Sequence, residues 1–181
     1  MSSPPKTPAP SDTHDASCTA CARPGLAFAA HDHGRCSADV LARSIAIAAA
    51  QGVRLTPVRR RVLEILLEDH RALGAYEVLV RLAADGFGNQ PPVAYRALDF
   101  LVEQGFAHRV DRLNAFAACL HPGEAHTPIF LICTGCKTVA ETPATPVRAA
   151  IDRAAAPLGF AVAQLNVEAL GLCPACQGAA A

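Results

Sequence analysis

The stretch that decides the fold is HRVDRLNAFAACLHPGEAHTPIFLICTGCKTVAE, residues 108–141, which holds three of the chain's seven histidines and three of its eight cysteines. Short apolar segments at 106–110 and 115–120 flank the sequence DRLN and predict a hairpin with asparagine in the turn. The run PIFLIC, 128–133, predicts a further strand. Helical patterns precede this stretch and a mixed pattern follows it. It therefore predicts a joint between two modules, and the joint is rich in metal-binding side chains.

The bulk composition indicates a globular protein without a membrane segment. Of the 181 residues, 51% are hydrophobic and 18% are charged, and 16 basic and 16 acidic side chains cancel to a net charge of zero. A neutral total argues against a protein that coats nucleic acid without selectivity. Four arginines nevertheless gather with no acid between them: Arg54, Arg59, Arg60 and Arg61.

The cellular compartment is predicted from what the sequence lacks. The apolar run 45–50 is too short to span a bilayer, and the N-terminus has no basic and apolar segments of the secretory type. We therefore expect a cytoplasmic protein with no membrane partner. In a reducing compartment, Cys-x-x-Cys pairs indicate metal or redox sites before disulfides.

The segment before the joint predicts four helices. Ser37 is a favourable N-cap for a helix over 38–51, and Thr56-Pro57 starts the next helix with threonine at the cap and proline in the first turn. Apolar residues at helical spacing predict two more helices, over 75–84 and 92–104. Three helices followed by a β-hairpin describe a winged helix-turn-helix, here preceded by one extra helix. The helix over 92–104 occupies the position of the recognition helix.

The segment after the joint predicts a small α/β unit. A short strand near 138–141 is followed by a helix to about Ala156, and 161–170 is predicted to be a third strand. Spacing predicts the buried face of that helix: Val147, Ala150, Ile151 and Ala154. A unit this small has little core, so a structural metal and a partner subunit would both stabilise it. The predicted fold class is α+β, in this order: a flexible N-terminal tail (1–36), a winged-helix DNA-binding domain (37–120), a hinge loop (121–127) and an α/β dimerisation domain (128–181).

Two Cys-x-x-Cys pairs are the most specific chemical pattern in the chain. Cys133 and Cys136 form one pair, Cys173 and Cys176 form the other, and four thiolates suit tetrahedral Zn²⁺. The segment 137–172 between them is longer than the usual zinc-ribbon spacing, so it must hold folded structure. The alternative is a redox dithiol, which needs one reactive pair rather than two matched pairs. We therefore predict a structural zinc whose loss unfolds the C-terminal unit.

A second group of candidate ligands has mixed donors: His108, Cys119, His126 and Glu141. Antiparallel pairing of the hairpin strands can bring His108 close to Cys119, and His126 follows in the connecting loop. Nitrogen, sulfur and oxygen donors in fours suit Zn²⁺ better than Fe²⁺, because a thiolate favours the softer, tetrahedral ion. Spacing alone leaves the grouping open, and the neighbouring Glu124 and His121 are alternative members.

The predicted tail contains a further thiol and imidazole cluster: Cys18, Cys21, His31, His33 and Cys36. Proline-rich, polar sequence before this cluster opposes helix formation. A mobile segment must be ordered before it can chelate a metal well, which weakens such a site. The cluster is therefore either an accessory metal site or a set of incidental side chains.

Five motifs occur in the order found in the Fur family of metal-dependent bacterial regulators: GVRLTPVRRRVLEIL, AYEVLVRL, PPVAYRALDFLVEQGFAHRV, HTPIFLICTGCKTVAE and GLCPAC. Over about residues 37–177 the chain resembles this family, and above all its zinc-sensing branch, the Zur repressors. The resemblance implies a homodimer of subunits with an N-terminal winged helix and a C-terminal α/β dimerisation domain. It also implies that zinc closes the dimer for binding to a palindromic operator in double-stranded DNA, which represses zinc-uptake genes.

The resemblance also implies roles for the two ligand groups. By motif match the four cysteines hold structural zinc, and the mixed group corresponds to the regulatory zinc ligands of Zur proteins, which makes two zinc ions per subunit. Iron and peroxide sensors of the family have a His-His-Asp-His type run where this chain has Ala125-His126-Thr127-Pro128. That departure and the cysteine in the site favour zinc. An iron- or peroxide-responsive regulator is the alternative within the family.

A zinc or thiol enzyme is the alternative from another class of protein. Catalytic zinc needs an open coordination position and a nearby acid or base. The mixed group offers four protein ligands, and no motif for a base accompanies it unless Glu141 serves as one. We therefore expect a regulator and not an enzyme.

Four side chains are candidates for DNA contact, given the winged helix and the resemblance: Tyr95, Arg96, Tyr76 and Arg54. Two hydrogen bonds from Arg96 to guanine would discriminate between bases by about 1–3 kcal/mol. The tyrosines offer rings to thymine methyl groups and hydroxyls to phosphates, and Arg54 would reach a phosphate or the minor groove. The family's TVYRAL motif reads VAYRAL here, so a threonine contact is absent. Solvated arginines and half-buried tyrosines are the alternative.

Overall fold

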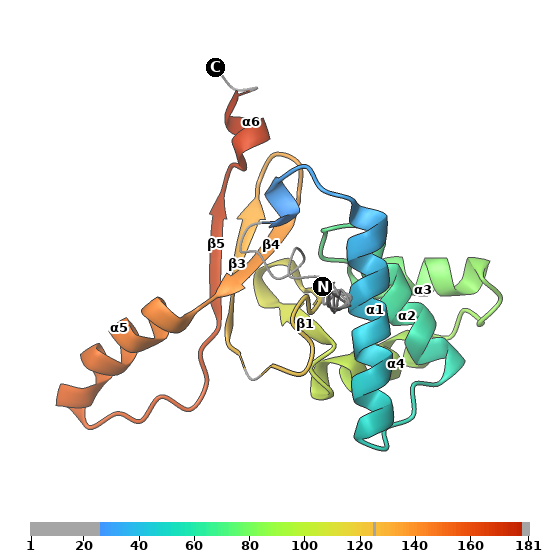
Figure 1. The fold of residues 1–181 in the computed structure, drawn as a ribbon, viewed down its shortest axis with the longest axis horizontal. Helices are drawn as coiled ribbons and strands as arrows, with labels where there is room; N and C mark the ends of the chain where they lie inside the picture. Colours follow the sequence, from blue (N-terminus) through green and yellow to red (C-terminus); the bar gives the residue numbers. More distant parts are fainter. Residues whose placement is uncertain (1–25, 125, 179–181) are drawn as a thin grey trace, which may run out of the picture.

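The computed structural model describes residues 26–124 and 126–178. Figure 1 shows helices α1 to α4 gathered on one side, strands β3, β4 and β5 beside them, and α5 extending away from the rest of the chain. The observed order of helices, hairpin and small sheet confirms the α+β class with an N-terminal winged helix. Within the described residues, no helix combines the length and apolar character needed to cross a bilayer.

Helix α1 (His33–Ala50) begins earlier than the sequence predicted. Asp32 is its N-cap, and the Asp32 carboxylate accepts a hydrogen bond from the Arg35 amide at 3.0 Å. Ser37 therefore does not cap the helix, because it lies within it and its hydroxyl donates to the Gly34 carbonyl. A 3₁₀ helix, η1 (Leu26–Phe28), precedes α1. The prediction of a flexible tail is thus wrong from residue 26 onward.

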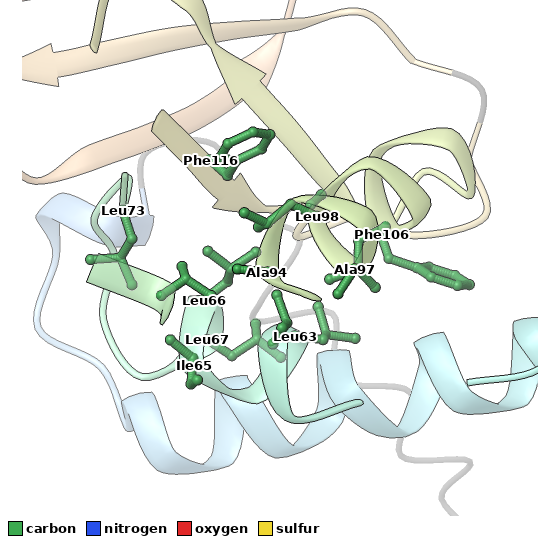
Figure 2. Close-up of a cluster of buried hydrophobic side chains, with 14 of the residues drawn as sticks. Leu63, Ile65, Leu66, Leu67, Leu73, Ala94, Ala97, Leu98, Phe106 and Phe116 are labelled. Carbon is green, nitrogen blue, oxygen red and sulfur yellow. The ribbon is translucent and has the colours of Figure 1, made fainter. Parts of the chain in front are cut away.

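The next three helices lie where their caps and spacing predicted: α2 (Pro57–Leu67), α3 (Ala75–Ala84) and α4 (Pro91–Glu103). The Thr56 hydroxyl caps α2 by accepting a hydrogen bond from the Arg59 amide at 3.4 Å. At the start of α3, the Gly74 amide donates to the Glu77 carboxylate at 2.8 Å. The apolar faces of α1 to α4 converge in the main core, and Figure 2 shows the side chains of α2 and α4 within it.

The wing is an antiparallel hairpin of β1 (Ala107–Val110) and β2 (Ala115–Ala118). A 3₁₀ turn joins the strands, and Asn114 closes it with a left-handed φ of 45°, a conformation that asparagine adopts more readily than most residues. Leu73, before α3, exchanges backbone hydrogen bonds with Phe116 of β2 at 2.8 and 2.9 Å. The hairpin is therefore fixed to the helical core.

The C-terminal sheet has the order β4-β3-β5. The central strand β3 (Pro128–Cys133) runs antiparallel to β4 (Val139–Pro143) and parallel to β5 (Val167–Gly171). The PIFLIC strand thus forms as predicted, whereas the last strand covers only the end of the predicted 161–170. A short helix, α6 (Pro174–Gly178), follows β5.

Helix α5 (Thr145–Ala155) connects β4 to β5 but has little cover. Its predicted inward residues Ala150 and Ala154 are exposed, so that part of the prediction is wrong for a single subunit. After the helix, Leu158 is 82% exposed and Phe160 is 66% exposed.

The C-terminal sheet shares its core with the wing. Val110 and Ala117 of the hairpin pack with three residues of the sheet: Phe130, Ile132 and Val139. The Val139 amide also donates to the His70 carbonyl, which precedes α3, at 2.9 Å. The two predicted domains are therefore joined by packing as well as by the loop, and the candidate metal ligands gather at this junction.

Candidate functional site

The four predicted cysteines lie together at one end of the C-terminal sheet. Cys133 ends β3 and Cys136 lies in the turn that follows it, whereas Cys173 lies after β5 and Cys176 lies in α6. All four sulfur atoms lie within 4.8 Å of one another. The Cys136 and Cys173 sulfurs are 3.7 Å apart, and the Cys173 amide donates to the Cys133 sulfur at 3.3 Å.

The surroundings of these cysteines favour some thiolates and oppose others. Backbone hydrogen bonds from Cys173 and Cys136 lower the pKa of Cys133 to about 6, and the Thr138 hydroxyl lowers the pKa of Cys136. Interactions with Cys173 and Cys133 raise the pKa of Cys176 to about 12. Four close sulfurs cannot all carry negative charge unless a cation offsets the repulsion, and thiolates bound to a metal ion are deprotonated outright. The donor set fits Zn²⁺.

The mixed group gathers at the junction of wing and sheet. His108 comes from β1, Cys119 follows β2, His126 lies in the loop before β3, and Glu141 belongs to β4. Their ligand atoms all lie within 4.8 Å of one another. His126 Nε2 is 2.6 Å from Glu141 Oε1 and 3.7 Å from the Cys119 sulfur. The structure therefore brings together all four residues of the predicted group.

Charge couples the members of this mixed group. Burial would raise the pKa of Glu141, but the neighbouring imidazoles of His108, His121 and His126 lower it below the usual range of a carboxyl. Cys119 and Glu141 raise the pKa of His126 to about 11. Burial lowers the pKa of His108, but Cys119 and Glu141 outweigh it and raise the value to about 9. Burial also raises the pKa of Cys119, and hydrogen bonds with the two histidines lower it overall.

The mixed group fits a bound zinc ion. The Nε2 atom of His108 is buried and makes no hydrogen bond within the described structure; its ion-pair partner, Glu141 Oε1, is 3.5 Å away. Such an atom indicates a missing partner at this position. Two imidazoles, a thiolate and a carboxylate are ligands that Zn²⁺ accepts in tetrahedral sites.

The two alternative members, His121 and Glu124, take supporting positions. His121 Nδ1 is 3.6 Å from Glu141 Oε1, but His121 is outside the group of four. The Glu124 backbone carbonyl accepts a hydrogen bond from His126 Nδ1 at 2.8 Å. Because a carbonyl can only accept, Nδ1 carries a proton, and Nε2 is the nitrogen that faces Glu141 and Cys119 and would bind the metal; second-shell contacts orient ligands in this way at metal sites.

A third group of metal-binding side chains lies where the predicted tail meets the helices. It consists of His31, Cys36 and His70, whose ligand atoms lie within 4.8 Å of one another. Cys36 is buried in α1, so it does not belong to a mobile tail. His33 is adjacent, with its ring centroid 4.5 Å from that of His70. The remaining predicted members, Cys18 and Cys21, lie outside the described residues.

Sequence reasoning missed His70 as a member of this group. It lies between α2 and α3, far from the other members along the chain, and no spacing pattern connects it to them. Burial, followed by the nearby His33 and His31, lowers the pKa of His70 to about 4. Its imidazole is therefore neutral near pH 7 and can act as a metal ligand.

The predicted DNA-facing residues lie on exposed surfaces. Tyr95 and Arg96 are exposed on α4, Tyr76 is exposed on α3, and Arg54 is exposed before α2. Among the ion pairs of the described residues, none involves Arg96 or Arg54. Both guanidinium groups are therefore available to an anionic partner.

The neighbouring arginine cluster is largely engaged within the protein. Arg60 pairs with Glu64 at 2.8 Å, and Arg61 pairs with Asp85 at 2.6 Å. The Arg59 guanidinium carbon lies 3.5 Å from the centre of the Phe100 ring. The basic patch that the sequence suggested is thus partly neutralised by Glu64, one helical turn away on α2, and by Asp85, which follows α3.

The chain is similar to known proteins both in sequence and in structure. The Zinc uptake regulation protein of Escherichia coli (strain K12) is 40% identical over 139 residues, which cover 76% of this chain and 81% of the relative. A structure described as a zinc uptake regulator complexed with zinc and DNA has a TM-score of 0.75 at 38% identity and covers 80% of this chain and 97% of that one. The structure of holo XcZur has a TM-score of 0.69 at 35% identity, covering 78% and 99%. No protein-family model matches the sequence.

Proposed function

The chain belongs to the Fur family of metal-dependent regulators, in its zinc uptake regulator (Zur) branch, and we propose that it is a zinc-responsive DNA-binding repressor of zinc-uptake genes. The observation that carries this proposal is the mixed group at the junction of wing and sheet. Its four donors come from both sides of that junction, so zinc binding there would change how firmly the two parts are held together.

The regulatory ligands are His108, Cys119, His126 and Glu141, and the structural ligands are Cys133, Cys136, Cys173 and Cys176. With zinc bound, the mixed group ties the hairpin to β4. Without it, the junction depends on the shared core and a few hydrogen bonds, including the one from the Leu120 amide to Glu141 at 3.0 Å. Changing such a joint from mostly open to mostly closed requires roughly 5.5 kcal/mol of differential zinc binding.

DNA recognition is proposed for the exposed face of α4. Arg96 would read a guanine in the major groove, with Tyr95 beside it and Tyr76 and Arg54 near the phosphates. A fixed joint sets the spacing of two such helices in a dimer, and that spacing must match the half-sites of a palindromic operator. Zinc binding and DNA binding are thus coupled, because both favour the same arrangement of the two recognition helices.

A homodimer is proposed from the uncovered C-terminal unit. Leu158 and Phe160 are large exposed apolar residues beside the sparsely covered α5. Exchanging Phe160 for aspartate would weaken the dimer by about 2 kcal/mol or more, roughly 30-fold in Kd, if it is a central contact. Analytical ultracentrifugation of the zinc-loaded protein measures this change.

No catalytic role is proposed for the mixed group. Two of the relatives described above are named as zinc uptake regulators. A repressor that binds chromosomal DNA would act in the cytoplasm. Glu141 lies within the ligand group and bonds to His126, so it is not positioned as a separate base.

The decisive experiment is a DNA-binding titration with free zinc buffered from scarce to ample at fixed salt. The DNA is a Zur-type palindromic operator, and the proteins are wild type, Cys119→Ser and Glu124→Gln. Glu124 is exposed in the same loop and contributes only its backbone carbonyl, so Glu124→Gln is the matched control. We expect zinc-dependent binding by wild type and Glu124→Gln and its loss in a folded Cys119→Ser. Binding that ignores zinc, or that responds instead to iron, would contradict the proposal.

A further inference from the structure

We propose that His31, Cys36 and His70 form a third metal site, specific for Zn²⁺ or a divalent ion of similar ligand preference, which fastens the N-terminal segment to the junction. The three residues come from the segment before α1, the first turns of α1 and the connection between α2 and α3. None of them belongs to the two groups described above. Two imidazoles and a thiolate are the ligand types that Zn²⁺ binds most often.

The hydrogen bonds of His31 prepare it to act as a ligand. Its Nδ1 lies 3.0 Å from the Ala29 carbonyl, which can only accept, so Nδ1 carries the proton. The other ring nitrogen, Nε2, then presents a lone pair, and it lies 3.0 Å from Nε2 of His70. A histidine that donates one N–H to a backbone carbonyl while its second nitrogen faces a cluster has the arrangement typical of metal-ligating histidines.

His33 has the same arrangement beside the cluster. Its Nε2 donates to the Glu68 carbonyl at 2.9 Å, which leaves Nδ1 as an acceptor. That Nδ1 is buried and has no hydrogen-bond partner among the described residues. An unsatisfied buried acceptor beside two other imidazoles and a thiol is costly unless a cation or a water satisfies it. We therefore assign His33 or a water to the fourth coordination position.

The location of the site gives it a mechanical role. On the N-terminal side of His31, Phe28 of η1 lines a pocket on the C-terminal sheet together with Leu131 of β3. On the C-terminal side of Cys36, α1 packs on the winged helix, and Arg43 of α1 donates to the Leu120 carbonyl at 3.1 Å, next to Cys119. The His70 carbonyl accepts from the Val139 amide of β4. A metal held by these residues would therefore brace the same junction that the mixed group spans, since Cys36 and His70 line one pocket together with Glu141 of the mixed group.

The first test counts zinc in the full-length protein. Wild type, His31→Ala, Cys36→Ser and His70→Ala are stripped of metal under reducing conditions and titrated with Zn²⁺ against a chromophoric chelator. Ser37→Ala is the matched control, because Ser37 lines the same pocket but bonds only to the Gly34 carbonyl. We expect three zinc equivalents per subunit in wild type and Ser37→Ala, matching the three ligand groups. Each ligand variant should lose one, with affinity for it reduced by on the order of 100-fold or more.

The second test identifies the ligand chemistry. Co²⁺ is added to Cys119→Ser protein that retains its four-cysteine zinc, so a sulfur-to-cobalt charge-transfer band must come from a cysteine outside both established groups. Adding Cys36→Ser should remove that band, whereas adding Ser37→Ala should preserve it. His31→Ala keeps the test valid if the buried Cys36→Ser or His70→Ala misfolds, since His31 is only partly buried and lies before α1.

Three results would overturn this proposal. The first is binding of only two equivalents by wild type, and the second is survival of the third equivalent in folded His31→Ala. The third is a cobalt band that persists without Cys36 and vanishes only when Cys18 and Cys21 are replaced. None of these results depends on DNA binding, so failure here leaves the repressor proposal intact. Hydrogen exchange supplies an independent readout: the third zinc equivalent should slow amide exchange in 26–36 of wild type and have no effect there in His31→Ala.

Discussion

The four-cysteine group and the mixed group contain the same number of ligands but connect different parts of the molecule. All four cysteines lie at one end of the C-terminal sheet, two at the end of β3 and in the turn after it and two after β5, and Cys136 is exposed. The mixed group takes His108 and Cys119 from the wing and Glu141 from β4, and Glu141 is only 6% exposed. The first group therefore closes a single unit, whereas the second connects two units.

We propose that this difference separates a structural role from a regulatory one. Metal bound within one unit adds its binding energy to the folding of that unit. Metal bound between two units adds energy only to the state in which both are docked, so it shifts a conformational equilibrium. Ligand origin, more than ligand chemistry, thus distinguishes the two groups. The predictions below test that distinction, starting with the largest expected effect.

Replacing Cys173 by serine should unfold the C-terminal unit. A structural zinc contributes on the order of 10 kcal/mol at neutral pH, and the core of this unit is too small to compensate. Cys173→Ser should lose one zinc ion, the β3–β5 pairing and the dimer. Circular dichroism, zinc analysis and sedimentation measure these losses.

The matched comparison is Cys119→Ser, which removes a thiol from the other group. It should remain a folded dimer with its four-cysteine zinc intact and lose only zinc-dependent DNA binding. If both variants unfold to the same extent, the mixed group is structural and the distinction between the two groups fails.

Replacing Glu141 by glutamine should have the next largest effect. Glutamine keeps the shape of the side chain but replaces an anionic oxygen donor by a neutral one, and it leaves His126 without its charged partner at 2.6 Å. We expect zinc affinity at the mixed group to fall by about 100-fold or more, since ligand loss exceeds the effect of second-shell changes. Zinc-dependent DNA binding should require correspondingly more free zinc. Unchanged zinc affinity would remove Glu141 from the ligand set.

Replacing His121 by glutamine should have a smaller effect on the same property. His121 contacts Glu141 at 3.6 Å from outside the group, so it orients a ligand rather than acting as one. Loss of such a contact typically costs 10–100-fold in metal affinity. The zinc stoichiometry should not change, and competition with a chelator measures the shift. Loss of a full zinc equivalent would instead show that His121 is itself a ligand.

The two ligand groups differed in how far the sequence could predict them. The cysteine pairs were identifiable from spacing, because each pair is local and only the pairs had to meet. The mixed group depended on a family resemblance, since its members lie on a hairpin, a loop and a separate strand. His70 was missed because only tertiary folding brings it to His31 and Cys36.

The errors in the fold predicted from the sequence have similar physical causes. The start of α1 was misplaced because Asp32 and Ser37 are both good cap residues, and the sequence does not say which one the chain uses. The inward face predicted for α5 is exposed because helical spacing identifies an apolar face but does not say what packs against it; in the proposed homodimer, the partner subunit would cover this face. In contrast, α2, α3 and the PIFLIC strand formed as predicted, since their apolar spacing and caps agree with the burial that the fold imposes.

The smallest effect we predict tests how tightly the four-cysteine group is packed. A Cβ at Gly135 would lie 2.9 Å from the Cys176 sulfur and 3.2 Å from its Cβ, closer than side chains normally approach. Gly135→Ala must therefore displace Cys176, and overpacking of this kind typically costs about 1–3 kcal/mol. Gly171→Ala is the matched control, because Gly171 lies on β5 close to Cys173 and a Cβ there meets nothing within 4 Å. Thermal unfolding of the zinc-loaded proteins should show a lower Tm for Gly135→Ala alone, with zinc-dependent DNA binding retained below that temperature. Equal Tm values for the two variants would mean that the turn after β3 adjusts to the added methyl group without loss of stability. The stability of the four-cysteine group would then have to come from the bound metal rather than from its packing.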